Sequence, residues 1–233
     1  MNTDEMVEHL GMMQLSDSFF PTGLFATSSG IEFLFFNKKI KNSDELCDLI
    51  KIFIKYQIGP ADCVAHSNAY DLAQKSNLQE IINVDQNIFF MKLVKETRDS
   101  STRSGIQLVR GVSSFIKENK VLNFYQDAIN NGEASGVYPV AFAIVSSSMG
   151  IEKEKSALAM LHGFVVSVVG AALRLGMIHH YEAQKIIHEI KPTISQCVVD
   201  NMGKSITEMW QFVPEIDVVQ ISHENMNSKM FIT

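Results

Sequence analysis

Apolar residues recur at intervals of three and four along most of this chain, the spacing that places them on one face of an α-helix. The clearest case follows Asn42–Asp44, whose side chains favour a helix N-terminus. Apolar residues then occupy positions 46, 49, 50, 53 and 54. Because Gly59 and Pro60 disfavour a helix interior, the pattern predicts a helix that begins near Asn42 and ends before Pro60.

The same spacing continues after this first stretch, so the sequence predicts helix after helix. One opens near Ser28, one at Tyr138, and the others are expected at 61–72, 81–93, 96–116, 156–173 and 183–199. Period-two alternation, which is typical of a half-buried strand, is rare except at Ile216–Ile221. We therefore expect an all-α fold, with a single-domain multi-helix bundle over residues 1–213 and a C-terminal tail over 214–233.

The run Ser156–Leu173 contains no Asp, Glu, Lys or Arg. A membrane span needs about 20 apolar residues, so this run is borderline. Gly163 and Gly170 weaken its apolar character and Arg174 follows at once, which favours a central buried helix. Small residues would let neighbouring helices approach closely, and Gly170→Leu should then overpack the core at a cost of roughly 1–3 kcal/mol. The same surface would also suit a subunit interface, and both readings stay open.

Composition narrows the class of protein. The 233 residues are 46% hydrophobic, which is enough for one substantial core. A formal net charge of −6 argues against nucleic acid as the main partner. Cys47, Cys63 and Cys197 are far apart and form no Cys-x-x-Cys pair, so we expect reduced thiols in a cytoplasmic protein. The N-terminal residues are acidic and precede no apolar leader, so neither secretion nor membrane anchoring is expected.

Motifs of catalysis are incomplete in this sequence. Gly203–Ser205 resembles the end of a phosphate-binding loop, but the glycine that this loop requires five positions earlier is Val198. His223 and Glu224 begin like a zinc-protease helix, but Asn227 stands where the second histidine belongs. No Gly-x-Ser-x-Gly elbow occurs. We therefore predict a protein that is not an enzyme and has no cofactor of its own.

Histidines offer a weak candidate for metal binding. His179, His180 and His188 lie within ten residues of each other, and imidazole suits nickel and copper. On a continuous helix His180 and His188 share a face while His179 points elsewhere, so these residues need ligands from another segment. Cys63 and His66 are three positions apart, but a buried thiol beside a polar turn explains them better. Stable metal binding within one chain is therefore not expected.

The stretch Leu15–Glu32 is more ordered than a plain linker requires. Two aromatic residues precede Pro21, Gly23 permits a tight turn, and Phe25 and a Ser-Ser-Gly-Ile-Glu run follow. As a whole the stretch resembles the N-terminal pattern of the urease accessory protein F family. Two further blocks are similar to that family, namely Glu96–Arg98 with Arg103–Gly105, and Tyr138–Phe142, which leads into the long apolar helix. In the first block, Arg98 and Arg103 are expected to pair with Glu96 and Asp99.

The C-terminus is also similar to the family pattern, over Pro214–Asp217, Ile221–Glu224 and Ser228–Phe231. Here Asn227 and Lys229 replace a tyrosine and an arginine of that pattern. A polar tail with widely spaced hydrophobic residues suits a partner groove better than the core of a monomer, because it pays its ordering entropy on binding. We therefore expect this tail to lie outside the core.

The resemblance implies an all-α scaffold, commonly a homodimer, that bridges urease accessory protein H (also called D) to the GTPase accessory protein G during nickel delivery to apo-urease. It implies that the tail anchors accessory protein H, and that the loop around Phe25 and the Arg98 block shape the dimer or the surface that faces the GTPase. The residues expected to contact partners are His223, Glu224, Met230, Phe231, Phe25, Arg98 and Arg103. The alternative is a direct nickel-binding chaperone with a histidine site at a dimer interface.

Overall fold

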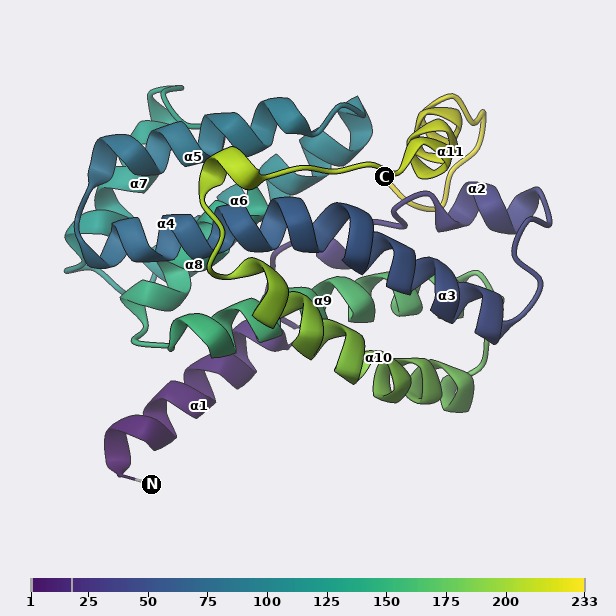
Figure 1. The fold of residues 1–233 in the computed structure, drawn as a ribbon, viewed down its shortest axis with the longest axis horizontal. Helices are drawn as coiled ribbons and strands as arrows, with labels where there is room; N and C mark the ends of the chain where they lie inside the picture. The colour runs from purple at the N-terminus through teal and green to yellow at the C-terminus, as the bar shows by residue number, and fades with distance from the viewer. Residues whose placement is uncertain (1, 18, 233) are drawn as a thin grey trace.

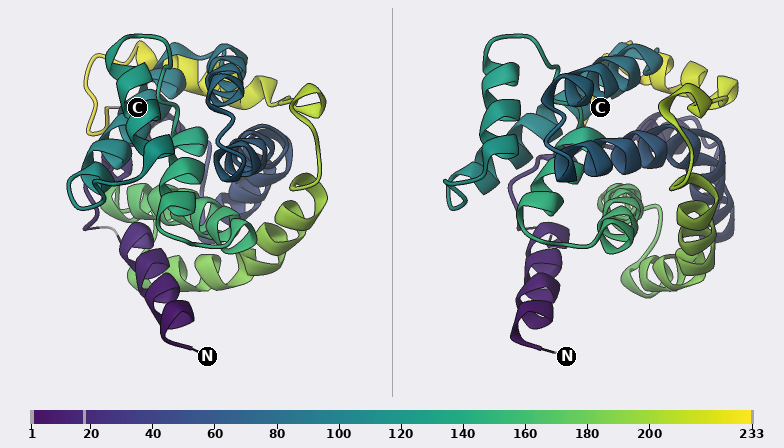
Figure 2. Two further views of the ribbon diagram at one scale, coloured as in Figure 1. Left: turned by 90° about the vertical axis from the view of Figure 1, so that its left-hand side faces the viewer. Right: turned by 60° about the vertical axis from the view of Figure 1, so that its left-hand side comes forward.

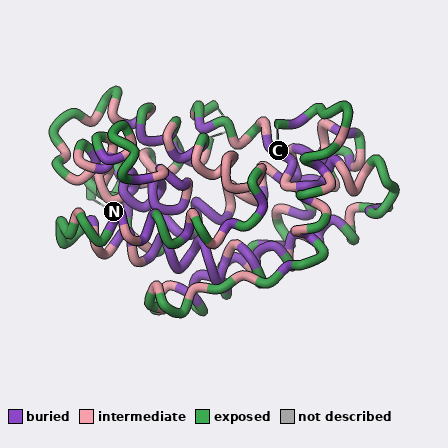
Figure 3. The backbone as a smooth tube through the Cα atoms, turned by 90° about the horizontal axis from the view of Figure 1, so that it is seen from above, coloured by how far each residue is buried: buried purple, intermediate pink, exposed green. Residues whose placement is uncertain are grey.

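The computed structural model describes residues 2–17 and 19–232, and every regular element within them is a helix (Figure 1). The prediction of an all-α fold is therefore confirmed. Ser18 of the N-terminal block and residue 233 of the tail lie outside the described part. Figure 3 shows buried backbone running through the middle of the molecule and exposed backbone along its edges.

Helix α9 (Lys153–Arg174) is the predicted central helix, and it packs against α1 (Thr3–Ser16), α8 (Tyr138–Ser148) and α10 (His180–Asn201). Helix α8 also packs against α4 (Val64–Gln74) and α6 (Lys95–Ser113), which closes the core. The periphery consists of α5 (Leu78–Met91), α7 (Lys120–Asn130) and the 3₁₀ turn η3 (Ile206–Glu208). Figure 2 shows α1 projecting away from the other helices.

Helix α9 is long and apolar enough to cross a bilayer by length and composition, but 56% of its apolar window is buried inside the molecule. One face remains only half-buried, and Gly163 and Gly170 lie on it. A Cβ added to Gly170 would meet no described atom within 4 Å. The expectation that Gly170→Leu overpacks the core is therefore wrong, because this glycine faces away from the neighbouring helices.

The predicted break at Pro60 is also wrong. Helix α3 (Ser43–Phe53) begins at Asn42, as expected, with the Asn42 side chain accepting from the Glu45 N–H, but the chain then continues through a π-helix, η2 (Ile54–Cys63), into α4. Pro60 has no N–H, so one hydrogen bond of this helix cannot form. The N–H of Phe212 donates to the carbonyl of Tyr56 at 2.9 Å, and the N–H of Trp210 donates to the carbonyl of Pro60 at 3.2 Å. A distant segment thus binds the backbone around the proline.

The tail starts with a helix rather than a strand. Residues Ile216–Ile221 lie within α11 (Pro214–Glu224), so their alternation does not report a strand. Pro214 occupies the first turn, where its missing N–H has no intrahelical partner to lose. Helix α11 packs against α2 (Ile31–Phe36) and α6, which brings the end of the chain beside α2 (Figure 1).

Candidate functional site

A buried histidine joins three helices where α11 meets the body of the molecule. His223 has no exposed surface, and its ring lies between two carboxylates. Its Nδ1 is 2.7 Å from Glu96 on α6, and its Nε2 is 2.9 Å from Glu32 on α2. Ionised carboxylates only accept hydrogen bonds, so this arrangement fits a ring that donates from both nitrogens.

The segment after α11 is held by the same two carboxylates. Glu32 accepts from the backbone N–H of Met230 at 2.6 Å and of Phe231 at 3.1 Å. Lys229 donates to Glu96 at 3.0 Å and to the carbonyl of Glu224 at 2.9 Å. We call this network the clasp. It consists of the side chains of Glu32, Glu96, His223 and Lys229 and the backbone N–H groups of Met230 and Phe231. Glu32 (1% exposed) and His223 form the buried centre of the clasp, and Lys229 closes it at the surface.

An arginine packed between two aromatic rings lies next to the clasp. The guanidinium carbon of Arg174 is 3.7 Å from the ring centroid of Phe25 and 4.4 Å from that of Phe231. Phe25 belongs to the 3₁₀ turn η1 (Leu24–Ala26), whose Ala26 carbonyl accepts from the N–H of Ile232 at 3.0 Å. Partial burial lowers the pKa of Arg174 from its usual range. Cation–π contacts of this kind stabilise by about 0.5–2 kcal/mol each, so they fasten the tail to η1 and α9.

One glycine allows the helices to meet this closely. Gly30 has φ +89°, a conformation that other residues rarely adopt, and it ends the loop that precedes α2. A Cβ at this position would lie 2.9 Å from the side chain of Val219 and 3.3 Å from that of Gln220. Gly30 therefore lets α11 lie against the N-terminus of α2, and this brings Glu32 to His223.

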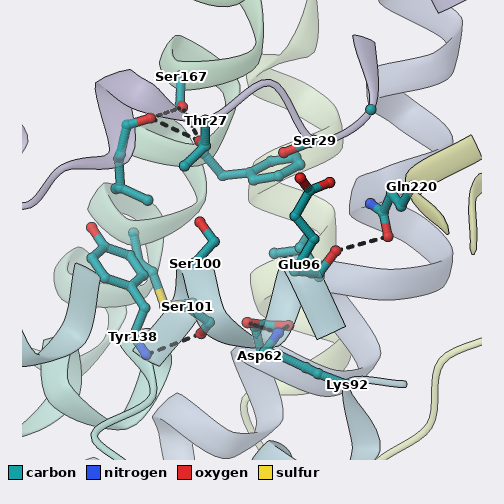
Figure 4. A pocket seen from close by; sticks show the side chains of 16 residues that line it. Thr27, Ser29, Asp62, Lys92, Glu96, Ser100, Ser101, Tyr138, Ser167 and Gln220 are labelled. Atoms are coloured by element: carbon teal, nitrogen blue, oxygen red, sulfur yellow. Dashed lines mark hydrogen bonds and ion pairs between the residues drawn. The ribbon is translucent and has the colours of Figure 1, made fainter. Parts of the chain in front are cut away.

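A cavity of about 90 Å³ adjoins the clasp (Figure 4). Glu96 and Gln220 line one end, and Gln220 accepts from the Thr97 hydroxyl at 3.0 Å. Asp62 and Lys92 line it too, and they form a buried ion pair with contacts of 2.8 and 2.9 Å. Gln220 is thus paired with Thr97, and Asp62 with Lys92.

Tyr138 lies along the same cavity, with its backbone N–H donating to the Ser101 hydroxyl at 3.1 Å (Figure 4). Burial raises the pKa of Tyr138 well above its usual value, so its phenol stays protonated at any physiological pH. Besides this phenol, the cavity offers carboxylates, an ammonium group and an amide. The clasp is the more informative part of the site.

The expectation that the tail lies outside the core is contradicted. Phe231 is only 3% exposed and belongs to the main hydrophobic cluster, and His223 is fully buried. Met230 and Glu224 are exposed, as is Phe25. The reason is that other side chains of the same molecule bind the tail, namely Phe25, Glu32, Glu96 and Arg174.

The arginines of the α6 block do not form the ion pairs that the sequence suggested. Arg98 donates to the carbonyl of Lys92 at 3.2 Å and lies 5.2 Å from the ring centroid of Phe89. Arg103 is exposed and makes no ion pair with any described residue. Glu96 binds the clasp, and Asp99 binds Lys95 on its own helix. Arg103 is therefore a group separate from the tail.

The histidines after α9 are not assembled into a site. His179 is the N-terminal cap of α10, and its Nδ1 accepts from the Glu182 N–H at 3.4 Å. His180 and His188 are exposed. Within residues 2–17 and 19–232, no group of three or more His, Cys, Asp or Glu residues is arranged to hold a metal ion. The structure therefore brings no ligands to these histidines from another segment.

The three cysteines are free and buried. Burial raises the pKa of Cys197 to about 11 and that of Cys63 further still, so both are thiols at neutral pH. His66 is fully buried too, beside Ser156 at 2.7 Å, and burial lowers its pKa to about 3. Cys63 and His66 are therefore core residues, as the sequence suggested.

Sequence reasoning missed the role of Glu32, Glu96 and Arg174. Glu32 and Glu96 stand in two of the family-like blocks and Arg174 directly follows the apolar run, but nothing in the sequence places them together, because 191 residues separate Glu32 from His223. One signal was available. A glutamate directly before an apolar run, as in Glu32 before Phe33–Phe36, is costly to bury unless it has a fixed partner.

Comparison with known proteins gives a consistent result. A family model described as UreF matches residues 40–191. A protein named urease accessory protein UreF from Trichodesmium erythraeum (strain IMS101) is 31% identical over 231 residues, which is 99% of each chain. Proteins of the same name from Yersinia enterocolitica and Yersinia pseudotuberculosis are each 26% identical over 232 residues, again 99% of each chain.

Proposed function

This chain belongs to the UreF family, and from that premise we propose that it acts in urease maturation as a scaffold with no active site of its own. In this role it bridges urease accessory protein H (or D) and the GTPase accessory protein G while nickel is inserted into apo-urease. It works in the cytoplasm, as a homodimer. Its effect is to raise the effective concentration of the GTPase near its target.

The clasp is the observation that supports this proposal best. It fixes the tail so that Phe25 (61% exposed), Met230 (62%) and Ile232 (55%) are presented on the surface, while Glu32 and His223 are buried beneath them. Ile232 lies beside η1, because its N–H donates to the carbonyl of Ala26. We call Phe25, Met230 and Ile232 the tail surface, with Glu224 as an exposed polar neighbour.

An ordered apolar patch of this kind suits a protein partner. Single exposed apolar residues are common on soluble proteins, but each of these three is held in place: the N–H of Met230 donates to Glu32, the N–H of Ile232 donates to the carbonyl of Ala26, and the Phe25 ring packs on Arg174. Little backbone freedom is therefore lost on binding. We propose that accessory protein H covers the tail surface. His223 and Phe231 then contribute to binding by positioning the exposed residues, not by touching the partner. Arg98 and Arg103 belong to a second surface, on α6, that contacts another partner.

The test uses substitutions that leave the clasp intact. Met230→Glu and Ile232→Glu place charges on the tail surface, and Val199→Glu, at a position 75% exposed on α10, is the matched control. The readout is light scattering on a sizing column with accessory proteins H and G. We expect wild type and the control to join a defined complex, and the tail-surface variants to stay apart at unchanged helicity. Wild-type protein that ignores both partners would refute the scaffold function.

A further inference from the structure

We propose that a groove between α5 and α6 binds an acidic segment of a partner protein. The groove has a volume of about 410 Å³, and its lining includes Arg103 and Arg110. It deepens the role proposed for the α6 surface by giving that surface a ligand chemistry. The inference rests on the proposed function only for the identity of the partner, because the groove can be tested with a peptide alone.

Two unpaired arginines are the first observation. Arg103 and Arg110 are both exposed, and seven residues of helix place them on one face, about 10 Å apart along the axis. Neither makes a hydrogen bond or an ion pair with any described residue. Asp99, which also lines the groove, is already paired with Lys95. Two guanidinium groups therefore point toward solvent without compensation.

The rest of the groove suits a peptide. Phe89 and Ile106 supply apolar surface, and Gln107 adds an exposed amide. Thr102 lines the groove as well, and its hydroxyl is buried without a hydrogen-bond partner among the described residues. Cations beside an apolar surface together match a chain that carries both carboxylates and apolar side chains.

The positive charges of Arg103 and Arg110 favour a ligand that carries carboxylates. Guanidinium binds carboxylate through two parallel hydrogen bonds, which a planar fork favours. The whole chain carries a formal charge of −6, so a long polyanion such as nucleic acid is repelled beyond the groove. A short acidic segment is not, because charges more than about 10 Å away are screened at 0.1 M salt. The local arginines therefore decide what binds.

The spacing of the arginines defines the segment. In a polyproline II conformation, residues three apart lie on the same side and are about 9 Å apart. A Glu-x-x-Glu segment in this conformation would present two carboxylates at nearly the separation of Arg103 and Arg110. The residues between them would place apolar side chains near Phe89 and Ile106.

The experiment uses fluorescence anisotropy with the full chain and a labelled peptide, Gly-Glu-Pro-Leu-Glu-Pro-Leu-Glu-Gly. We expect saturable binding that weakens as salt is added, and no binding of the matching glutamine peptide. Arg103→Ala with Arg110→Ala should raise the dissociation constant by at least about tenfold, since each lost charge-assisted hydrogen bond is worth that much or more. Lys55→Ala with Lys191→Ala removes the same charge from exposed positions elsewhere and should have little effect.

Charge reversal separates recognition from a structural effect. The variant Arg103→Glu with Arg110→Glu should lose the glutamate peptide and bind the corresponding lysine peptide. The proposal is overturned if the glutamate peptide does not bind, or if the glutamine peptide binds equally well. It is also overturned if the control variant Lys55→Ala with Lys191→Ala weakens binding as much as Arg103→Ala with Arg110→Ala. Tighter binding of a labelled oligothymidylate would also overturn it. These outcomes test the groove alone. The scaffold function is tested separately, by complex formation with accessory proteins H and G.

Discussion

Replacing Glu32 by glutamine tests whether the clasp holds the tail. The substitution removes a buried negative charge with little change in shape. The carboxylate of Glu32 accepts three hydrogen bonds, from the His223 ring and from the N–H groups of Met230 and Phe231. An amide offers one oxygen and one NH₂ group. At least one of the three donors would therefore face another donor in the variant.

The expected cost follows from these contacts. A hydrogen bond to a charged group contributes about 1.5–3 kcal/mol, and the variant loses one or two of them. Breaking one partner of a buried ion pair costs about 3–5 kcal/mol, and His223 would keep only Glu96. We therefore expect Glu32→Gln to lower the free energy of unfolding by about 3–5 kcal/mol, or to release the tail before the rest of the chain unfolds.

Two measurements distinguish these outcomes. Urea denaturation followed by circular dichroism gives the global change, and the rate of tryptic cleavage after Lys229 reports release of the tail. Glu224→Gln, an exposed neighbour, serves as the control and should change stability by less than about 0.5 kcal/mol. A loss below about 1 kcal/mol in Glu32→Gln, with cleavage after Lys229 as slow as in wild type, would refute the clasp.

Two further predictions concern the core. The pKa of His66 is lowered to about 3 in the folded protein, so between pH 6.5 and 3 only the unfolded chain binds this proton, and stability falls as the pH drops. His66→Gln should reduce the stability lost between pH 7 and pH 5 by about 2 kcal/mol in urea titrations, and an unchanged loss would contradict this. Gly59→Ala should destabilise by more than about 2 kcal/mol in thermal unfolding, because its Cβ would lie 2.3 Å from the sulfur of Cys197. Gly170→Ala, with open space around it, should stabilise by up to about 1 kcal/mol, and equal effects at both glycines would show the packing argument to be wrong.

Elements whose determinants are local could be predicted from the sequence. The N-terminus of α3 was found because Asn42 caps it with its own side chain, and α9 because its apolar residues need no distant partner to favour a helix. The course through Pro60 could not be found in this way. The backbone around the proline binds Trp210 and Phe212, which lie far along the chain and carry no local signal near Pro60.

The candidate site was predicted only in its parts. The sequence singled out His223, Phe231 and Phe25, and the structure brings all three to one place. Their burial could not be inferred from the tail alone. A polar segment is costly to bury unless other residues of the chain bind its polar groups, and those residues lie far away in the sequence. These residues are Glu32, whose three hydrogen-bond donors all belong to the tail, and Arg174, which packs on Phe25 and Phe231.

The residues of the clasp are synthesised at different times. Glu32 and His223 are 191 residues apart. At a synthesis rate of 5–20 residues per second, a nascent chain carries Glu32 for about 10–40 s before His223 exists. During this interval α2 can pack against α9 but not against α11, and Glu32 lacks the three donors that the tail provides. Closing the clasp is therefore a late event in folding, and a slowly translated chain would depend on chaperones for longer than a fast one.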